Sequence, residues 1–443
     1  MRGRVFRTAI FFVALLAAAS AWAQDAPHRL TLKEAIERGL QHNLRVRVAD
    51  TRIEEAQGTR ERRLANLLPR VRGEGTAMLQ NRSLRAFGIT FPGVPPVVDP
   101  FSTYDFRFSA EQPVFDRQAY HQWKASEKQE QAVREDYQDV RDAIIRQVAG
   151  LYLSVQAAAA RVEATESRVA TAQALYELAL ERRNAGVATG VDVLRAQVQL
   201  ANEQQRRLEA RNTAERGLLA LARTIGLSPG TRLELADALR FEPVIPPDAN
   251  AAIAASLADR ADFRALAVQR EALVAQQNAN KARYLPRFAI GGNYGAIGRS
   301  FGEMHRTGAL QGALTISLFD RDRKGEQQEL DARIRRIDHQ MADLRLGIEA
   351  EIRDALLVLE SAAQEVSVAE QGRALAAREL ELARERFHAG VANNIEVIRA
   401  QDAQSRAQEN YILAVSRHTD AKISLARALG ATEKIYGQYL GIP

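Results

Sequence analysis

The residue types that most often carry catalysis or bind metals are few and scattered in this chain. It contains no Cys and seven His, and no two His stand at the i, i+4 spacing that binds a metal ion from one helix. The chain has no phosphate-binding loop, nucleophile elbow or dinucleotide-binding glycine pattern. The sequence therefore predicts no enzymatic activity, no cofactor and no metal site.

Charged residues instead form two short patterns of the same kind, 204 residues apart. Each has a Thr or Asn, an acidic residue three positions later and an Arg three positions after that. The residues are Thr189, Asp192 and Arg195 in the first pattern and Asn393, Glu396 and Arg399 in the second. The first spacing resembles a capping box, which starts a helix. The second spacing allows an ion pair at i, i+3 or between neighbouring helices, and both interpretations stay open.

A helical turn precedes each of these patterns. Gly186-Val187 and Gly390-Val391 stand where a helix would end on a residue with left-handed backbone, which favours glycine. We therefore expect each pattern to begin the second helix of a helical hairpin.

The hairpins belong to a duplication of about two hundred residues. Residues 177–197 and 381–401 are identical at 13 of 21 positions, and the same offset of 204 takes Phe115-Asp116 to Phe319-Asp320. Loops drift in length during evolution, whereas packed elements do not. A constant offset therefore indicates two helical repeats without insertions.

The first residues have the pattern of a secretory signal. Three Arg within the first seven residues precede an apolar run over 9–19, and Ala21-Trp22-Ala23 has the small-x-small spacing that signal peptidase recognises. We expect export, with cleavage after Ala23, and no further segment suited to a transmembrane helix. The 61 basic and 55 acidic residues are interleaved, which argues against a nucleic-acid partner.

Proline marks where long helices can form. No Pro falls within 114–228 or 287–442, and Pro disrupts helix interiors. We predict long helices over 116–184 and 320–388, returning helices over 191–226 and 395–429, and leading helices over 32–66 and 251–283. Apolar residues from Ile144 to Ala179 recur every 3.5 residues on average, which predicts coiled-coil packing.

Four shorter segments alternate apolar and polar residues, as β-strands do. They cover residues 71–82, 103–111, 287–296 and 310–318, and residues 103–111 place Tyr104, Phe106 and Phe108 on one face. This length and period suit a membrane strand, although an ordinary hairpin of a soluble domain has the same pattern. The first repeat has 13 extra residues between its strands, which we assign to an extracellular, Pro-rich loop over 91–100 that is not itself a strand.

Two hairpins supply only four strands, which cannot close a barrel, and open edges are not tolerated in lipid. Several copies must therefore combine their strands, giving eight, twelve or sixteen for a dimer, trimer or tetramer. The residues alone do not choose among these numbers.

The combined features resemble the TolC-type outer-membrane efflux proteins over nearly the whole mature chain. The residues that carry this resemblance are Leu68-Pro69-Arg70 before a strand, Gln112-Pro113-Val114-Phe115-Asp116 after one, its copy Leu318-Phe319-Asp320, and the two Ala-Gly-Val turns. The resemblance implies a mixed α/β membrane protein: a homotrimeric, twelve-stranded β-barrel in outer-membrane lipid, continued into the periplasm by a long α-helical barrel. It also implies that the turns dock a periplasmic adaptor tied to an inner-membrane transporter of the RND, ABC or MFS type.

The same resemblance assigns roles to the residues near the turns. Carboxylates just past the second turn narrow the tunnel mouth in such proteins, and Glu396 matches one such position. One turn further on, where the family can carry a second acid, this chain has Arg399, and Arg195 holds the equivalent place. We take Glu396, Arg399, Asp192 and Arg195 as candidate constriction residues, and Gly186, Val187, Gly390 and Val391 as candidate docking residues.

The sequence thus predicts a passive exit duct of a tripartite efflux pump or a type I secretion system. A secreted trimeric coiled-coil structural protein or adhesin is the alternative, although it would lack paired membrane hairpins. The expected organisation is a signal peptide (1–23), a first repeat (24–226), a Pro-containing linker (227–250), a second repeat (251–430) and a C-terminal tail (431–443).

Overall fold

The structure, a computed structural model, divides the chain into two compact units that each contain segments of both repeats. The sheet unit comprises residues 51–135 and 264–343, and the helical unit comprises the remaining segments. The structure describes residues 28–90, 92–93, 95–237, 239–392, 394–430 and 432–433. The expected signal peptide, Asn393 and most of the C-terminal tail lie outside the described residues.

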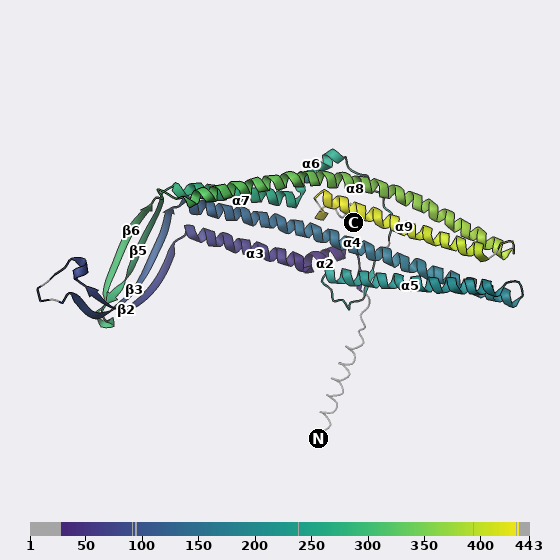
Figure 1. Ribbon diagram of the computed structural model, residues 1–443, viewed down its shortest axis with the longest axis horizontal. Coiled ribbons are helices and arrows are strands. Elements are labelled where there is room, and N and C mark those ends of the chain that lie inside the picture. The colour runs from purple at the N-terminus through teal and green to yellow at the C-terminus, as the bar shows by residue number, and fades with distance from the viewer. Residues whose placement is uncertain are drawn as a thin grey trace, which may run out of the picture. The chain divides into compact units, whose positions relative to one another are not determined.

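The sheet unit contains one antiparallel sheet of four strands (Figure 1). Its strands are β2 (Arg70–Ser83), β3 (Val97–Phe115), β5 (Arg287–Gly298) and β6 (His305–Thr315). The strand order is β2-β3-β5-β6, so each predicted hairpin is present and a β3–β5 ladder joins the two. Within the described chain, β2 and β6 each keep one edge without a partner strand.

The two faces of β3 differ as the alternation predicts. Phe106 and Phe108 are 45% and 70% exposed on one face. On the other face the Arg107 guanidinium lies 2.6 Å from an Asp105 carboxylate oxygen and donates to Asn293 Oδ1 at 3.1 Å. A half-exposed aromatic face opposite a paired ionic face suits a sheet with lipid on one side and water on the other.

The limits of two strands differ from the prediction. Strand β3 begins at Val97, so residues 97–100 of the expected loop belong to the sheet. The register shifts between Gln80 and Arg82 on β2, opposite the stretch that contains Pro100. Such a bulge accommodates Pro100, because Pro has no backbone N–H group and the hydrogen-bond ladder is interrupted at the bulge. Strand β6 ends at Thr315, although the alternation continues to residue 318.

The two long helices are confirmed. Helices α4 (Arg117–Asn184) and α8 (Asp322–His388) have 68 and 67 residues, and α5 (Gly190–Thr224) and α9 (Asn394–Ala428) return from them. The offset of 204 carries the first six residues of the predicted seam to α8. All six of these α8 residues are buried: Ile348, Ile352, Ala355, Leu359, Ala362 and Val366. The 3.5-residue period therefore predicted the packed face of α8.

Each predicted leading helix is in fact two helices. Helix α2 (Leu32–His42) is separated from α3 (Leu44–Leu64) by Asn43, and α6 (Ala249–Asp259) from α7 (Ala261–Lys281) by Arg260. Both separating residues have extended backbone, with ψ of 128° and 122°. Side-chain contacts hold each break: Asn43 donates to Thr224 O at 2.9 Å, and Arg260 pairs with Asp262 at 2.7 Å and with Glu351.

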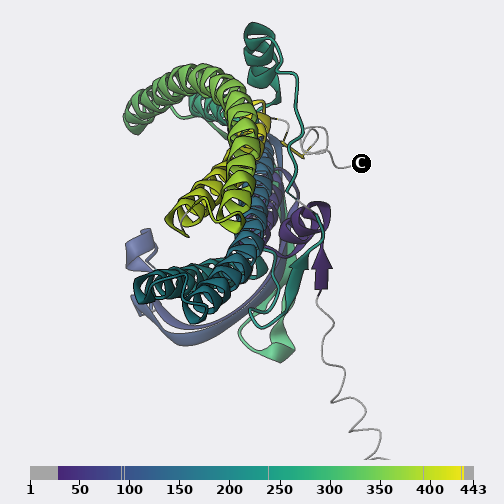
Figure 2. The same ribbon diagram turned by 90° about the vertical axis from the view of Figure 1, so that its right-hand side faces the viewer.

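In the helical unit, α5, α4, α9 and α8 follow one another in an arc (Figure 2). Apolar contacts join α4 to α5 and α8 to α9, and Arg168 of α4 donates to Ser405 O of α9 at 2.6 Å. Helix α6 packs on α8 and α9, and it lies on the outer side of the arc (Figure 2). The arc therefore has a convex face that α6 partly covers and a concave face.

Helix α4 contains one stretch that is long and apolar enough to cross a membrane by composition, which the sequence analysis did not expect. Of this stretch, 44% is buried inside the protein, and its length and composition would also suit the core helix of a soluble protein. The finding is weak evidence for a membrane span.

The linker between the repeats packs on the helical unit through a short strand pairing and side-chain hydrogen bonds. Strand β4 (Leu233–Leu235) pairs in parallel with β1 (His28–Leu30), a pairing that the sequence did not indicate. The following Asp237 carboxylate accepts hydrogen bonds from Leu32 N and from the Tyr152 hydroxyl, both at 2.8 Å. Further along, the Phe241 ring lies 4.7 Å from the ring of His418 on α9.

His418 should make the stability of this region depend on pH. It is 1% exposed, and burial, with a smaller contribution from the nearby Lys422 charge, lowers the pKa of His418 to about 4. The unfolded chain binds a proton near pH 6.5, whereas the folded chain does so only near pH 4, so stability is lost as pH falls between these values.

We expect His418→Phe to keep the ring packing and to flatten the dependence of the melting temperature on pH between about 6.5 and 4. Thermal unfolding followed by circular dichroism over this pH range measures the effect. His339→Phe, at an exposed position of α8, is the control and should retain the wild-type profile. An unchanged slope in the His418 variant contradicts the prediction.

Candidate functional site

The candidate site consists of the two turns that close the helical hairpins. Gly186 and Gly390 have φ of 78° and 77°, a left-handed backbone that glycine adopts without strain. Gly186 N donates to Arg183 O at 3.0 Å and Val187 N to Arg182 O at 2.9 Å, and the second repeat has the equivalent bonds at 3.1 and 3.0 Å. These bonds satisfy the last carbonyl groups of α4 and α8.

The predicted capping box is present in the first repeat. The Thr189 hydroxyl accepts from Asp192 N at 3.3 Å, and the Asp192 carboxylate accepts from Thr189 N at 3.0 Å. A further bond from the Thr189 hydroxyl, at 2.7 Å, is the main cause that lowers the pKa of Asp192 below its ordinary value. Arg195 lies 3.8 Å from Asp192, so this exposed ion pair is weak.

The second repeat pairs its acid differently. Glu396 accepts from Arg386 Nε of α8 at 3.0 Å, so its ion-pair partner is a residue of the adjacent helix and not Arg399 at i, i+3. Arg399 is exposed and forms no ion pair with any residue that the structure describes. Asn393, the expected cap, lies outside the described residues.

An arginine of the first hairpin reaches the second. Arg182 donates to Phe387 O at 2.9 Å, and its guanidinium lies 4.0 Å from the centre of the Phe387 ring. Sequence analysis missed this contact, and it also missed the role of Arg386. The available signal was the repeat itself, because Arg182 and Arg386 are the same residue at the offset of 204.

The two turns expose apolar side chains beyond this charged layer. Val187 and Val391 are 73% and 72% exposed. Below them, Leu175 and Leu178 of α4 pack against a buried cluster of α8 and α9 that includes Phe387. The site therefore consists of a packed base and two exposed valines, one at each turn.

Among the described residues, no group of three or more His, Asp or Glu is placed to hold a metal ion. The turns carry charged groups in three different states. Asp192 is bonded in a helix cap, Glu396 is paired with Arg386, and Arg399 has no ion-pair partner among the described residues.

Thr189→Ala should destabilise the start of α5 by about 1 kcal/mol, because the cap bond to Asp192 N is lost. Hydrogen exchange of the amides of residues 190–193 measures this change locally. Thr213→Ala is the matched control, since the Thr213 hydroxyl bonds only within α5, to Glu209 O. Equal exchange at residues 190–193 in both variants would show that the cap contributes nothing.

Comparison with known proteins agrees with this geometry. The chain matches the model of the family described as outer membrane efflux protein over residues 35–227 and 252–431. It is 26% identical over 328 residues to outer membrane protein OprJ of Pseudomonas aeruginosa, covering 70% of this chain and 65% of OprJ. It is 23% identical over 340 residues to the alkaline protease secretion protein AprF of the same organism, covering 72% of this chain and 69% of AprF.

The fold is also shared with a solved channel. The CmeC outer membrane channel of Campylobacter jejuni superposes with a TM-score of 0.81 over 92% of this chain and 89% of that chain, at 15% sequence identity. This likeness concerns the fold alone, whereas the family match covers both repeats. The chain belongs to the outer membrane efflux protein family, and its location is the outer membrane.

Proposed function

We propose that this protein is the outer-membrane exit duct of a tripartite efflux pump or a type I secretion system. The observation that carries the proposal is the four-stranded sheet with two free edges in a protein of the outer membrane. A sheet in lipid must close on itself so that every backbone group finds a partner. The β2 edge of one copy therefore pairs with the β6 edge of the next.

Exposed apolar stripes on the helical unit support the same assembly. Helix α5 exposes Leu194, Leu208 and Leu219 at 61%, 57% and 48%, away from its contact with α4. Helix α8 exposes a similar stripe, which includes Leu357, Val368 and Leu382 at 67%, 69% and 42%. Leu357 and Val368 also line grooves that α8 shares with α9. Each outer helix of the arc thus has an apolar face without a partner in one chain.

The two stripes match in spacing. Along α5 the steps from Leu194 to Leu208 and on to Leu219 are 14 and 11 residues, and back along α8 the steps from Leu382 to Val368 and on to Leu357 are also 14 and 11. Because α5 leaves its turn and α8 approaches its turn, the two helices run antiparallel. One register therefore brings all three pairs together. Joining α5 of one copy to α8 of the next is a head-to-tail contact, which closes into a ring.

Three copies give twelve strands, the number that the family resemblance implies. The exposed Val187 and Val391 are the proposed contacts for a periplasmic adaptor, which in turn joins an inner-membrane transporter of the RND, ABC or MFS type. The energy for export would come from that transporter. The alternative, a secreted adhesin, would not require membrane hairpins whose free edges pair between copies.

The absence of Cys makes the assembly testable by disulfide cross-linking. Leu208→Cys combined with Val368→Cys should give, on oxidation in outer membranes, cross-linked dimers and trimers with the trimer as the largest species. Denaturing electrophoresis without reductant measures this. The control combines Leu208→Cys with Leu382→Cys, which displaces one partner by 14 residues, about 21 Å along a helix. Dimers alone, or ladders beyond three, would contradict a closed ring of three.

The charges at the turns should set conduction through the mouth of the duct. In the proposed trimer, three copies of Glu396 and Arg399 surround the axis, and like charges there repel unless the other sign is close. Arg399→Ala should raise single-channel conductance in planar bilayers and shift selectivity toward cations. Glu396→Ala should also raise it, with a shift toward anions, because Arg386 loses its partner as well.

Asp192→Ala is the control for the conductance measurement, because the Asp192 carboxylate is engaged in its own helix cap. It should act mainly on stability or on adaptor docking. Unchanged conductance and selectivity in both second-repeat variants would leave Glu396 as a structural residue only.

A further inference from the structure

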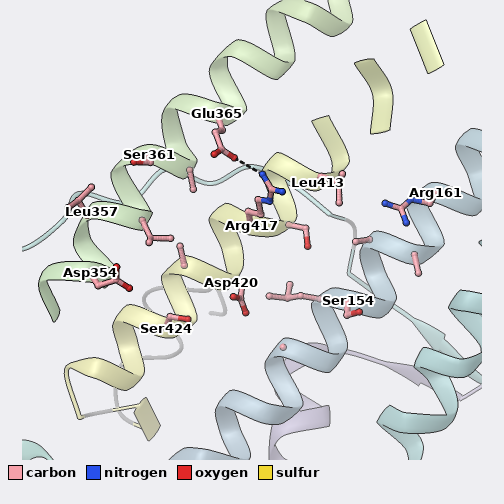
Figure 3. A pocket seen from close by; sticks show the side chains of 18 of the residues that line it. Ser154, Arg161, Asp354, Leu357, Ser361, Glu365, Leu413, Arg417, Asp420 and Ser424 are labelled. Atoms are coloured by element: carbon pink, nitrogen blue, oxygen red, sulfur yellow. Dashed lines mark hydrogen bonds and ion pairs between the residues drawn. The ribbon is translucent and has the colours of Figure 1, made fainter. Parts of the chain in front are cut away.

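The helical unit has a groove that neither the turns nor the sheet explain. It has a volume of about 670 Å³ and is lined by residues of α4, α8 and α9 with Thr213 of α5 (Figure 3). This volume is in the range of sites for small organic ligands. Helix α6 packs on a different face of α8 and α9, on the outer side of the arc (Figure 2). The groove therefore opens on the concave face.

One end of the groove is acidic. Asp354 of α8 and Asp420 of α9 are both exposed and both line it. Neither forms a hydrogen bond or an ion pair with any residue that the structure describes. The nearby Arg146 donates instead to Ser424 Oγ at 3.2 Å. Two carboxylates without partners at one end of a cleft favour a positively charged group.

The other end contains the arginines of the groove. Arg417 is paired with Glu365 at 3.3 Å (Figure 3), so its charge is largely balanced within the groove. Arg161 lines the same end from α4. Eleven residues of α8 separate Asp354 from Glu365, which is about 16 Å along a helix. Arg417 lies three residues before Asp420 on α9, about one helical turn away. Its pairing with Glu365 leaves the Asp420 carboxylate without a partner among the described residues.

Apolar side chains also line the groove, Leu357 and Val358 close to Asp354 on α8 and Leu413 one turn beyond Arg417 on α9. Leu357, Val358 and Leu413 are 67%, 45% and 38% exposed and line the groove. Leu357 also belongs to the apolar stripe of α8, so it forms the rim nearest the proposed neighbouring copy. Contact with a ligand would remove this apolar surface from water.

We infer that the groove binds amphiphilic organic cations, with the positive group between Asp354 and Asp420 and the apolar body against Val358 and Leu413. This inference rests on the proposed function and deepens it, because the concave face lines the lumen of the proposed duct. A cargo molecule of this class would then bind transiently to the wall as it passes. The site differs from the charged mouth at the turns in both residues and position.

The test uses the full-length protein in lipid nanodiscs and rhodamine 6G, an amphiphilic cation, with binding measured by fluorescence polarisation. Replacing both carboxylates (Asp354→Asn and Asp420→Asn) should raise the Kd at least about fivefold, and each single change should raise it less. Asp343→Asn, at an exposed position of the same helix, is the matched control and should bind as the wild type does. Fluorescein, an anionic dye of similar size, should bind more weakly than rhodamine 6G.

A second measurement locates the dye. Ser361 lines the groove, and the chain has no other thiol, so Ser361→Cys reports on this place alone. Rhodamine 6G should slow its modification by a maleimide, whereas Ser228→Cys, at an exposed loop position of the same unit, should be modified at an unchanged rate.

Equal affinity in the double Asn variant, tighter binding of fluorescein, or no protection of Ser361→Cys would each overturn the inference. Cross-linking and conductance test the duct itself and do not depend on dye binding. A failure of the cross-linked trimer with intact, Asp-dependent dye binding would therefore remove the proposed function and leave the groove as a binding site.

Discussion

The need to satisfy backbone hydrogen bonds in lipid governs this structure. A sheet of four strands leaves the outer edges of β2 and β6 without partners, and such edges are not stable in a membrane. In the proposed duct, other copies of the chain supply the missing partner strands. The helical unit likewise exposes apolar residues on α5 and α8, and in the proposed duct these faces pack against neighbouring copies.

Duplication gives the two hairpins the same motifs but does not make them equivalent. Arg182 and Arg386 occupy the same place in the two repeats, yet Arg182 contacts the ring and carbonyl of Phe387 whereas Arg386 pairs with Glu396. The difference follows from one neighbour, because the first repeat has Arg183 where the second has Phe387. Because of the Phe387 side chain, the arginine of the first repeat contacts the other hairpin. The equivalent arginine of the second repeat pairs within its own hairpin.

Local patterns were enough to predict what depends on neighbours in the chain. The missing prolines and the 3.5-residue period predicted α4 and α8, and the spacing of Thr189 and Asp192 predicted a cap that the structure contains. The alternation over residues 103–111 predicted one aromatic and one ionic face of β3. Each of these features is set by interactions that span a few residues, so the sequence records it directly.

The sequence by itself determined the helices, the hairpins and the turns, whereas contacts between distant segments decided the rest. The break at Asn43 depends on its hydrogen bond to Thr224 O. The β3–β5 ladder joins strands of different repeats, and the pairing of Glu396 with Arg386 requires that α8 and α9 pack together. The groove of Asp354 and Asp420 likewise exists only because three helices meet. Such contacts join residues far apart in the chain, and no local period or spacing specifies which of them will meet.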